Sequence, residues 1–300
     1  MRFIFIMLIV SGLSCGSTTS ERTSPEPGNF KPGVQDEPGE PHSNTYSWLD
    51  KYSEKNSIKS RIHVPEGYTR VKEAEGSFAS WLRFIQLKEG DPEVHLYDGT
   101  LKNDQSVHFA VVDLDVGKKD LQQCADAVMR LRAEYLFSKG LFKEIHFNYT
   151  SGDKVSFTDW CGGKRPSVKG NKVVFVQTPS CTPDHQHFMG YMENIFSYCG
   201  TLSLSREMKS IALQEVMPGD VFLYGGTPGH GVLVMDVAVN DSTGDKVFLI
   251  AQSYMPAQEM HILKNPRNAG IGPWYSLKEI GKKLVTPEWT FGIDELKRFQ

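Results

Sequence analysis

Two apolar runs separated by a glycine-rich loop stand out in the pattern of hydrophobic and polar positions along the chain. The runs cover residues 221–224 and 232–235, and the loop between them reads Gly-Gly-Thr-Pro-Gly-His-Gly. Short apolar runs bounded by turn residues are typical of strands in a buried sheet. The pattern therefore predicts a β-hairpin, with His230 at the point where the loop becomes the second strand.

The remaining apolar pattern predicts helices and strands in mixed order. Apolar residues at helical spacing predict a helix over residues 120–137, with Asp120 as its N-cap and Cys124 in its first turn on the buried face. Two further helices are expected over residues 77–87 and 183–199. Strands are expected over residues 62–64, 68–71, 94–96, 107–114, 143–150, 172–177 and 246–252, with a loop over 159–163 and a polar helix start at 292–294. This mixture predicts an α+β fold.

The amino end has the pattern of an export signal. Arg2 precedes an apolar stretch over residues 3–13, which is too short to span a bilayer as a helix. Cys15 follows Gly-Leu-Ser, and this order resembles a bacterial lipoprotein signal, in which the cysteine is lipidated and becomes the first residue. The expectation is an exported protein, in the periplasm or on the cell surface, held at a membrane through Cys15. A plain secretory signal is the alternative.

Composition divides the rest of the chain into a linker and a domain. Residues 16–44 are rich in Ser, Thr, Pro, Gly and Glu and have almost no apolar side chains, which predicts a flexible linker after the signal peptide of residues 1–15. Residues 45–300 are long enough to form a single α+β domain, within which residues 45–116 are predicted to be a β-rich portion or subdomain.

Charge and histidine spacing exclude some classes of partner. The formal net charge is −3, with 23% charged residues, so the chain lacks the basic surface that nucleic-acid binding requires. Its nine histidines show no spacing of a metal site, and there is no phosphate-binding glycine loop. No metal, cofactor or nucleic acid is expected.

The cysteines set a condition on any thiol chemistry. Four remain after Cys15, namely Cys124, Cys161, Cys181 and Cys199. In an oxidising compartment an even number suggests disulfides, for which three connectivities exist. If Cys124 is in a disulfide, it cannot be a nucleophile.

Three residues in order along the chain suggest a catalytic site. Cys124 at a helix N-terminus is placed where the helix dipole and free N–H groups lower the pKa of a thiol. His230, at the start of a strand, is placed to accept the thiol proton, and Gln252, at the end of the next strand, to orient the imidazole. Each also has an ordinary structural role available: Cys124 as a core residue, His230 in a turn, and Gln252 bonded to backbone groups.

This order of residues resembles papain-like cysteine amidases of bacterial cell walls, the CHAP and NlpC/P60 groups. The matching pieces are Gln123-Cys124 at a helix start, Pro-Gly-Asp-Val over residues 218–221, and Gly229-His230 before an apolar strand. Gln252 stands where Asn, Glu or His is commoner. The resemblance implies an antiparallel sheet with packed helices and a catalytic role for Cys124, His230 and Gln252.

A second resemblance extends over nearly all of the chain after the linker. Its stretches are residues 61–68, 77–83, 113–134, 146–152, 218–240, 251–258 and 262–265. On these the chain is similar to an uncharacterised family of bacterial exported proteins, a domain of unknown function. This resemblance brings no established activity with it.

Two functions from different classes follow from these features. The first is a cell-envelope cysteine amidase or peptidase that cleaves peptide or cell-wall amide bonds. The second is a non-catalytic envelope protein that binds glycan or peptide in the same cleft. Trp81, Trp160 and Tyr254 are candidates to line that cleft, or else to fill the core.

Overall fold

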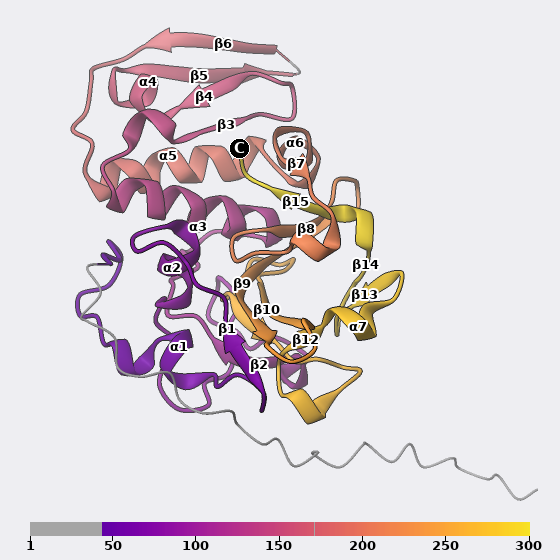
Figure 1. The fold of residues 1–300 in the computed structure, drawn as a ribbon. Coiled ribbons are helices and arrows are strands. Elements are labelled where there is room, and N and C mark those ends of the chain that lie inside the picture. Colours follow the sequence, from indigo (N-terminus) through magenta and orange to yellow (C-terminus); the bar gives the residue numbers. More distant parts are fainter. Residues whose placement is uncertain (1–43, 171) are drawn as a thin grey trace, which may run out of the picture.

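The computed structural model describes residues 44–170 and 172–300. The predicted signal peptide, the lipidation of Cys15 and residues 16–43 of the predicted linker lie outside the described residues. Among the described residues, helix and strand alternate along the chain (Figure 1), which confirms the α+β prediction.

One antiparallel sheet organises the fold. Its strands lie in the order β2-β11-β10-β9-β8-β15-β7, while β1 pairs with β9 and β12 pairs with β10. The strands are β1 (Tyr68–Arg70), β2 (His108–Val111), β7 (Lys209–Ser210), β8 (Val221–Tyr224), β9 (His230–Asn240), β10 (Lys246–Gln252), β11 (His261–Leu263), β12 (Tyr275–Ser276) and β15 (Leu296–Arg298). Three separate hairpins are formed by β3 (His146–Asn148) with β4 (Lys154–Ser156), β5 (Lys164–Lys169) with β6 (Lys172–Gln177), and β13 (Lys283–Val285) with β14 (Thr290–Gly292).

The predicted central hairpin is confirmed. Strand β8 pairs with β9 in antiparallel register, with Tyr224 opposite His230. The next strand, β10, has the predicted bounds and pairs with β9 from the other side, with Ala251 opposite Leu233. Strand β9 is buried over its first nine residues, because both of its neighbours and both faces of the sheet cover it.

Helices divide the molecule into the main sheet and a smaller lobe. The helices are α1 (Ile58–Arg61), α2 (Phe78–Arg83), α3 (Cys124–Ser138), α4 (Phe157–Cys161), α5 (His185–Tyr198), α6 (Thr201–Glu207) and α7 (Leu277–Ile280). In Figure 1, α3 and α5 lie between the sheet and the lobe that contains β3 to β6 and α4.

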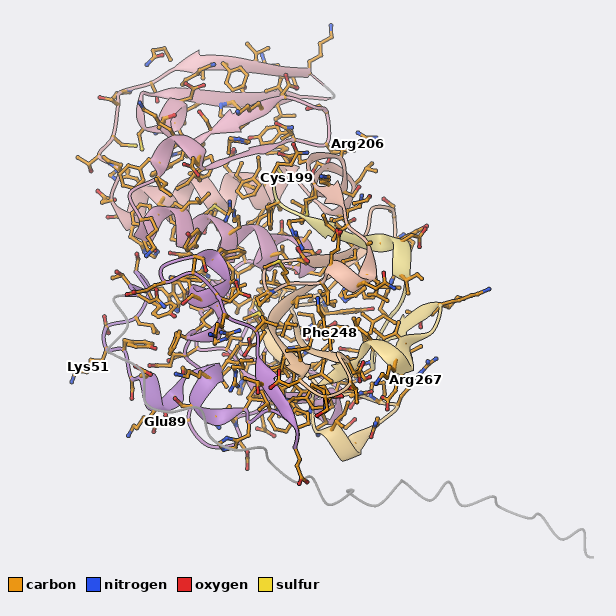
Figure 2. The ribbon with its side chains drawn as sticks, viewed as in Figure 1. Lys51, Glu89, Cys199, Arg206, Phe248 and Arg267 are labelled. Carbon is orange, nitrogen blue, oxygen red and sulfur yellow. The ribbon has the colours of Figure 1, made fainter. Side chains whose placement is uncertain are left out.

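Each face of the sheet has its own apolar core. Leu233 and Met235 of β9 pack with the residues of α3 and α5. Val232 and Val234, the alternate positions of β9, pack with Phe222, Phe248 and Phe291 on the other face, and Figure 2 shows Phe248 within the sheet region. Because side chains alternate along a strand, a sheet covered on both faces needs apolar residues at consecutive positions, as in the run at 232–235.

Several predicted boundaries are wrong for local reasons. Helix α3 begins at Cys124 and not at Asp120, because Gln123 takes the N-cap position and the Asp126 side chain accepts from its backbone N–H over 3.1 Å. Residues 159–163, predicted as a loop, contain the last turn of α4, which the Ser156 side chain caps.

Other differences concern the first and last parts of the domain. No strand forms at 62–64 or 94–96, and residues 45–116 contribute only β1 and β2, both of which join the main sheet. This portion is therefore less rich in strands than predicted. The helix start expected at 292–294 is a single 3-10 turn, Ile293–Glu295, which leads into β15.

All four described cysteines are free thiols, so the disulfides suggested by their even number are not formed here. Cys161 and Cys181 are nevertheless neighbours, because the Cys181 N–H donates to the Cys161 carbonyl over 2.8 Å. Cys199, labelled in Figure 2, follows α5 and packs against the core of α3 and α5.

A buried carboxylate ties the N-terminal portion to the sheet. Asp236 of β9 is fully buried; Arg70 Nε of β1 lies 2.6 Å from its Oδ2, and Arg83 Nε of α2 lies 2.8 Å from its Oδ1. Charges that are taken out of water need such partners, because desolvation is otherwise not compensated. Asp236 thus joins three elements that are far apart in the sequence.

We predict that Asp236→Asn lowers the free energy of unfolding by about 3–5 kcal/mol, because two buried guanidinium groups then lose the negative charge that neutralises them. Urea unfolding followed by circular dichroism measures the change.

The matched control is Asp159→Asn, which removes a carboxylate paired with Lys164 where both side chains are about half exposed. A change of about 1 kcal/mol or less is expected there. Equal losses in the two variants would contradict a special role for Asp236.

Candidate functional site

Cys124 is fixed at the N-terminus of α3 by contacts from the segment after β10. The Ser253 hydroxyl donates to the Gln122 carbonyl over 3.0 Å, and the Ala257 N–H donates to Asp120 Oδ1 over 2.7 Å. Asp120 is thus a partner for this segment and not the N-cap that the sequence suggested. These bonds place the first turn of α3 beside the end of β10.

The Cys124 sulfur lies among backbone N–H groups, yet burial dominates its ionisation. The nearby backbone N–H groups of Gly231, Ala125 and Cys124 itself favour the thiolate, but burial raises the pKa of Cys124 to about 11. The lowered pKa expected from the helix N-terminus is therefore wrong. The unfavourable free energy of removing the thiolate from water exceeds the stabilisation that the local N–H groups provide.

His230 and Gln252 are in direct contact, as predicted. The Nε2 atom of His230 lies 2.9 Å from Gln252 Oε1, and both side chains are almost fully buried. The His230 ring also lies against Tyr254, Trp289 and Phe291, with centroid distances of 4.8, 5.3 and 5.7 Å. Burial lowers the pKa of His230 to about 4, although the bond to Gln252 acts in the opposite direction, so the imidazole is neutral near pH 7.

The polar groups behind Gln252 were not predicted from the sequence. The Gln252 Nε2 atom donates to Glu288 Oε2 over 2.6 Å and lies 3.4 Å from His261 Nε2. The second oxygen of Glu288 accepts from Lys102 over 2.5 Å. No spacing rule could have found these residues, because each belongs to a different loop or strand and they meet only in the fold. In the sequence, Glu288 can be recognised only as a glutamate that precedes Trp289 in a turn.

Cys124 lies near the backbone of Gly231, the residue after His230. Among the residues that the structure describes, no hydrogen bond joins the Cys124 sulfur to the His230 ring. A side chain at Gly231 would point toward Val221 and Leu223, which belong to the apolar core on the α3 face of the sheet. The His230 ring lies on the opposite face, where it stacks with Phe291. Contact between thiol and ring therefore requires a side-chain movement around the first residue of β9.

The three residues predicted to line the cleft lie in different parts of the structure. Tyr254 lies against His230 and, as a partly exposed residue, reaches both the site and solvent. Trp81 is fully buried, and its indole Nε1 donates to the Thr45 carbonyl over 3.1 Å, so its assignment to substrate binding is wrong. Trp160 contacts Tyr191 and lies under Arg165, in the lobe of α4 and β5, and the structure does not bring it to His230.

The described residues contain no group of three or more His, Cys, Asp or Glu side chains placed to hold a metal ion. A cavity of about 490 Å³ is lined by Tyr149, Tyr198, Val168, Val173 and their neighbours, away from the Cys124 and His230 side chains. In the described part of the chain, the helices are all too short or too polar to cross a membrane.

The fold and the site define an α+β protein with a buried histidine–glutamine pair next to a helix-borne cysteine. The chain belongs to the family described as Domain of unknown function (4846), whose model matches residues 58–298. No curated protein and no solved structure matches the chain.

We predict that iodoacetamide alkylates Cys124 of the folded protein at a rate that rises about tenfold per pH unit from about pH 7 to about pH 10, because only the thiolate reacts. Because the pKa of about 11 lies above this range, the fraction of Cys124 present as thiolate rises throughout it. Peptide mass spectrometry at each pH measures the rate.

His230→Ala is expected to leave this profile unchanged, because an imidazole with a pKa of about 4 carries no charge in this range. The urea-unfolded protein provides the reference, with half-maximal reactivity near about pH 8.5. A plateau of reactivity below about pH 7 that disappears in His230→Ala would reveal a thiolate–imidazolium pair and contradict the prediction.

Proposed function

We propose that the protein is a cysteine amidase or peptidase that acts on peptide or cell-wall amide bonds, with Cys124 as nucleophile, His230 as base and Gln252 as the residue that orients the base. The observation that carries this proposal is the 2.9 Å contact of His230 Nε2 with Gln252 Oε1, one residue before Gly231, whose backbone lies near Cys124. A helix-borne cysteine, a strand-borne histidine and a polar residue on the adjacent strand also support a papain-like fold.

The proposed mechanism starts from a neutral pair. Burial keeps Cys124 as a thiol and His230 as an imidazole, so proton transfer accompanies attack on the carbonyl carbon and does not precede it. The thiol proton passes to His230, the sulfur forms a thioester, and the protonated His230 returns the proton to the departing amine. Water then hydrolyses the thioester and restores the thiol. Hydrogen bonds around the site are often loose in a free enzyme and tighten on substrate binding.

The backbone around Cys124 supports an oxyanion site. The backbone N–H groups of Cys124, Ala125 and Gly231 lie near the sulfur and favour negative charge there. Donors that are fixed by a helix terminus and a strand need no rearrangement when negative charge develops on the substrate oxygen. Tyr254, against the His230 ring and partly exposed, is a candidate contact for the substrate.

The second candidate is a non-catalytic envelope protein that binds glycan or peptide at the same place. Two observations favour it: the raised pKa of Cys124, and the lack of a direct bond between the Cys124 sulfur and the His230 ring in the described structure. Aromatic side chains beside the pair, Tyr254 and Trp289, suit stacking on a sugar or a peptide whether or not a bond is cleaved.

We predict that the purified protein releases new amino groups from cell-wall peptide fragments, and that Cys124→Ala abolishes this release because it removes the nucleophile. His230→Ala is expected to lower kcat/KM by about 10²–10⁴-fold through loss of the base. Product mass spectrometry and an amine assay measure both effects.

The matched control is Cys199→Ala, which removes a partly buried thiol after α5 and is expected to retain wild-type kcat/KM. If fragments bind to wild type and to Cys124→Ala with equal affinity and are never cleaved, the amidase proposal is contradicted and the binding function is supported.

The location we propose is the cell envelope, with export directed by residues 1–15 and a lipid on Cys15 as the membrane anchor. We predict that the full chain, expressed in a bacterial host, is found in the membrane fraction, and that Cys15→Ser moves it to the soluble exported fraction because the lipid is lost. Immunoblots of fractionated cells measure the distribution. A Cys15→Ser protein that stays with the membrane would contradict lipid anchoring.

A further inference from the structure

The Gln252 side chain is held at both of its polar atoms. Its Oε1 lies 2.9 Å from His230 Nε2, and its Nε2 lies 2.6 Å from Glu288 Oε2 and 3.4 Å from His261 Nε2. The side chain is fully buried, so water cannot replace any of these partners. The orientation of the amide is therefore decided by which of its partners can accept and which can donate.

We propose that Glu288 is a positioning residue: its carboxylate fixes the orientation of the Gln252 amide, and the amide fixes the tautomer of His230. The inference deepens the proposed function and rests on it for the role of His230 as a base.

Glu288 can hold the amide in one orientation only. A carboxylate next to an ammonium group accepts hydrogen bonds and offers none, and Glu288 has Lys102 Nζ 2.5 Å from its other oxygen. The Lys102 side chain is almost completely buried, so this pair is shielded from water. If the amide were reversed, Gln252 Oε1 would face a carboxylate oxygen, and two acceptors would repel each other. The Gln252 nitrogen must therefore face Glu288.

His261 favours the same orientation from a second side. Its Nδ1 atom lies 2.8 Å from the Glu259 carbonyl, which can only accept, so Nδ1 carries the proton and Nε2 is an acceptor. Burial lowers the pKa of His261 to about 3, so the ring stays neutral and its Nε2 stays free to accept. The second N–H of the Gln252 amide thus also has an acceptor.

This orientation decides the chemistry of His230. Gln252 presents only its oxygen to His230, so the Nε2 atom of the imidazole must carry a proton, and Nδ1 is left with a lone pair. A reversed amide would make Nε2 the acceptor and place the proton on Nδ1. In the proposed reaction Nδ1 receives the thiol proton. With the amide reversed, Nδ1 already carries a proton and cannot act as the base.

The experiment compares the tautomer of His230 in four proteins by two-dimensional NMR of ¹⁵N-histidine-labelled samples near neutral pH, with His230→Ala used to assign the signal. Glu288→Gln keeps the size of the side chain but can donate as well as accept. The matched control is Glu279→Gln, because Glu279 also accepts from an amide nitrogen, that of Asn268 at 2.6 Å, on the exposed surface.

The expected result is a His230 protonated at Nε2 in the wild type and in Glu279→Gln, and a mixture with the Nδ1 tautomer in Glu288→Gln. Glu288→Ala removes the carboxylate by truncation and is expected to give the same mixture, and unchanged melting temperatures show that the fold is retained. An unaltered Nε2 tautomer in both Glu288 variants, or an Nδ1 tautomer in the wild type, would overturn the proposal.

The result does not depend on the proposed function. The tautomer is observed without substrate, so a Glu288-dependent tautomer in a protein that cleaves nothing would refute the amidase and keep the positioning role. If cleavage is found, Glu288→Gln is expected to lower kcat by about tenfold or more with little change in KM, because the fraction of enzyme with a usable base falls.

Discussion

The antiparallel pairing of β9 with β10 holds the main sheet and the candidate site in place. Strand β9 is covered on both faces and paired on both edges, so its register cannot slip without exposure of apolar side chains or the loss of its buried Asp236 contacts. The same register brings the end of β10 beside the start of β9, where Gln252 and His230 meet on one face of the sheet. The site is thus a consequence of strand pairing.

Burial explains the electrostatics of this site. It raises the pKa of the Cys124 thiol and lowers the pKa values of His230 and His261, so the neutral form of each group is favoured over its charged form. Neutral groups can persist in such a place only if their hydrogen-bonding atoms find partners. Gln252 connects these partners, because its oxygen serves His230 and its nitrogen faces Glu288 and His261.

Both candidate functions use the same arrangement in different ways. An amidase requires the Cys124 sulfur and the His230 ring to meet, which the alternation of side chains along β9 opposes in the free protein. A binding protein requires only the aromatic side chains and the rigid polar groups behind them. Membership of the Domain of unknown function (4846) family assigns no activity and does not distinguish them. The choice between them depends on movement of two side chains, and not on the fold.

Elements with local signals could be predicted from the order of the amino acids alone. The hairpin of β8 and β9, the bounds of β10 and the contact of His230 with Gln252 follow from apolar runs, turn residues and the meeting of adjacent strands. The start of α3 was missed by four residues because two acidic side chains, Asp120 and Asp126, are both suitable near a helix start, and only long-range contacts show that Asp120 bonds Ala257 instead.

Other properties depend on contacts between distant parts of the chain and are seen in the folded protein alone. The buried position of Trp81 and the contact of Glu288 with Gln252 come from segments that are far apart in the sequence. The direction of the Cys124 pKa shift was predicted wrongly because the helix terminus is a local effect, whereas desolvation comes from everything packed around the sulfur. Local patterns therefore specified the pair of His230 and Gln252, and packing set its protonation and its further partners.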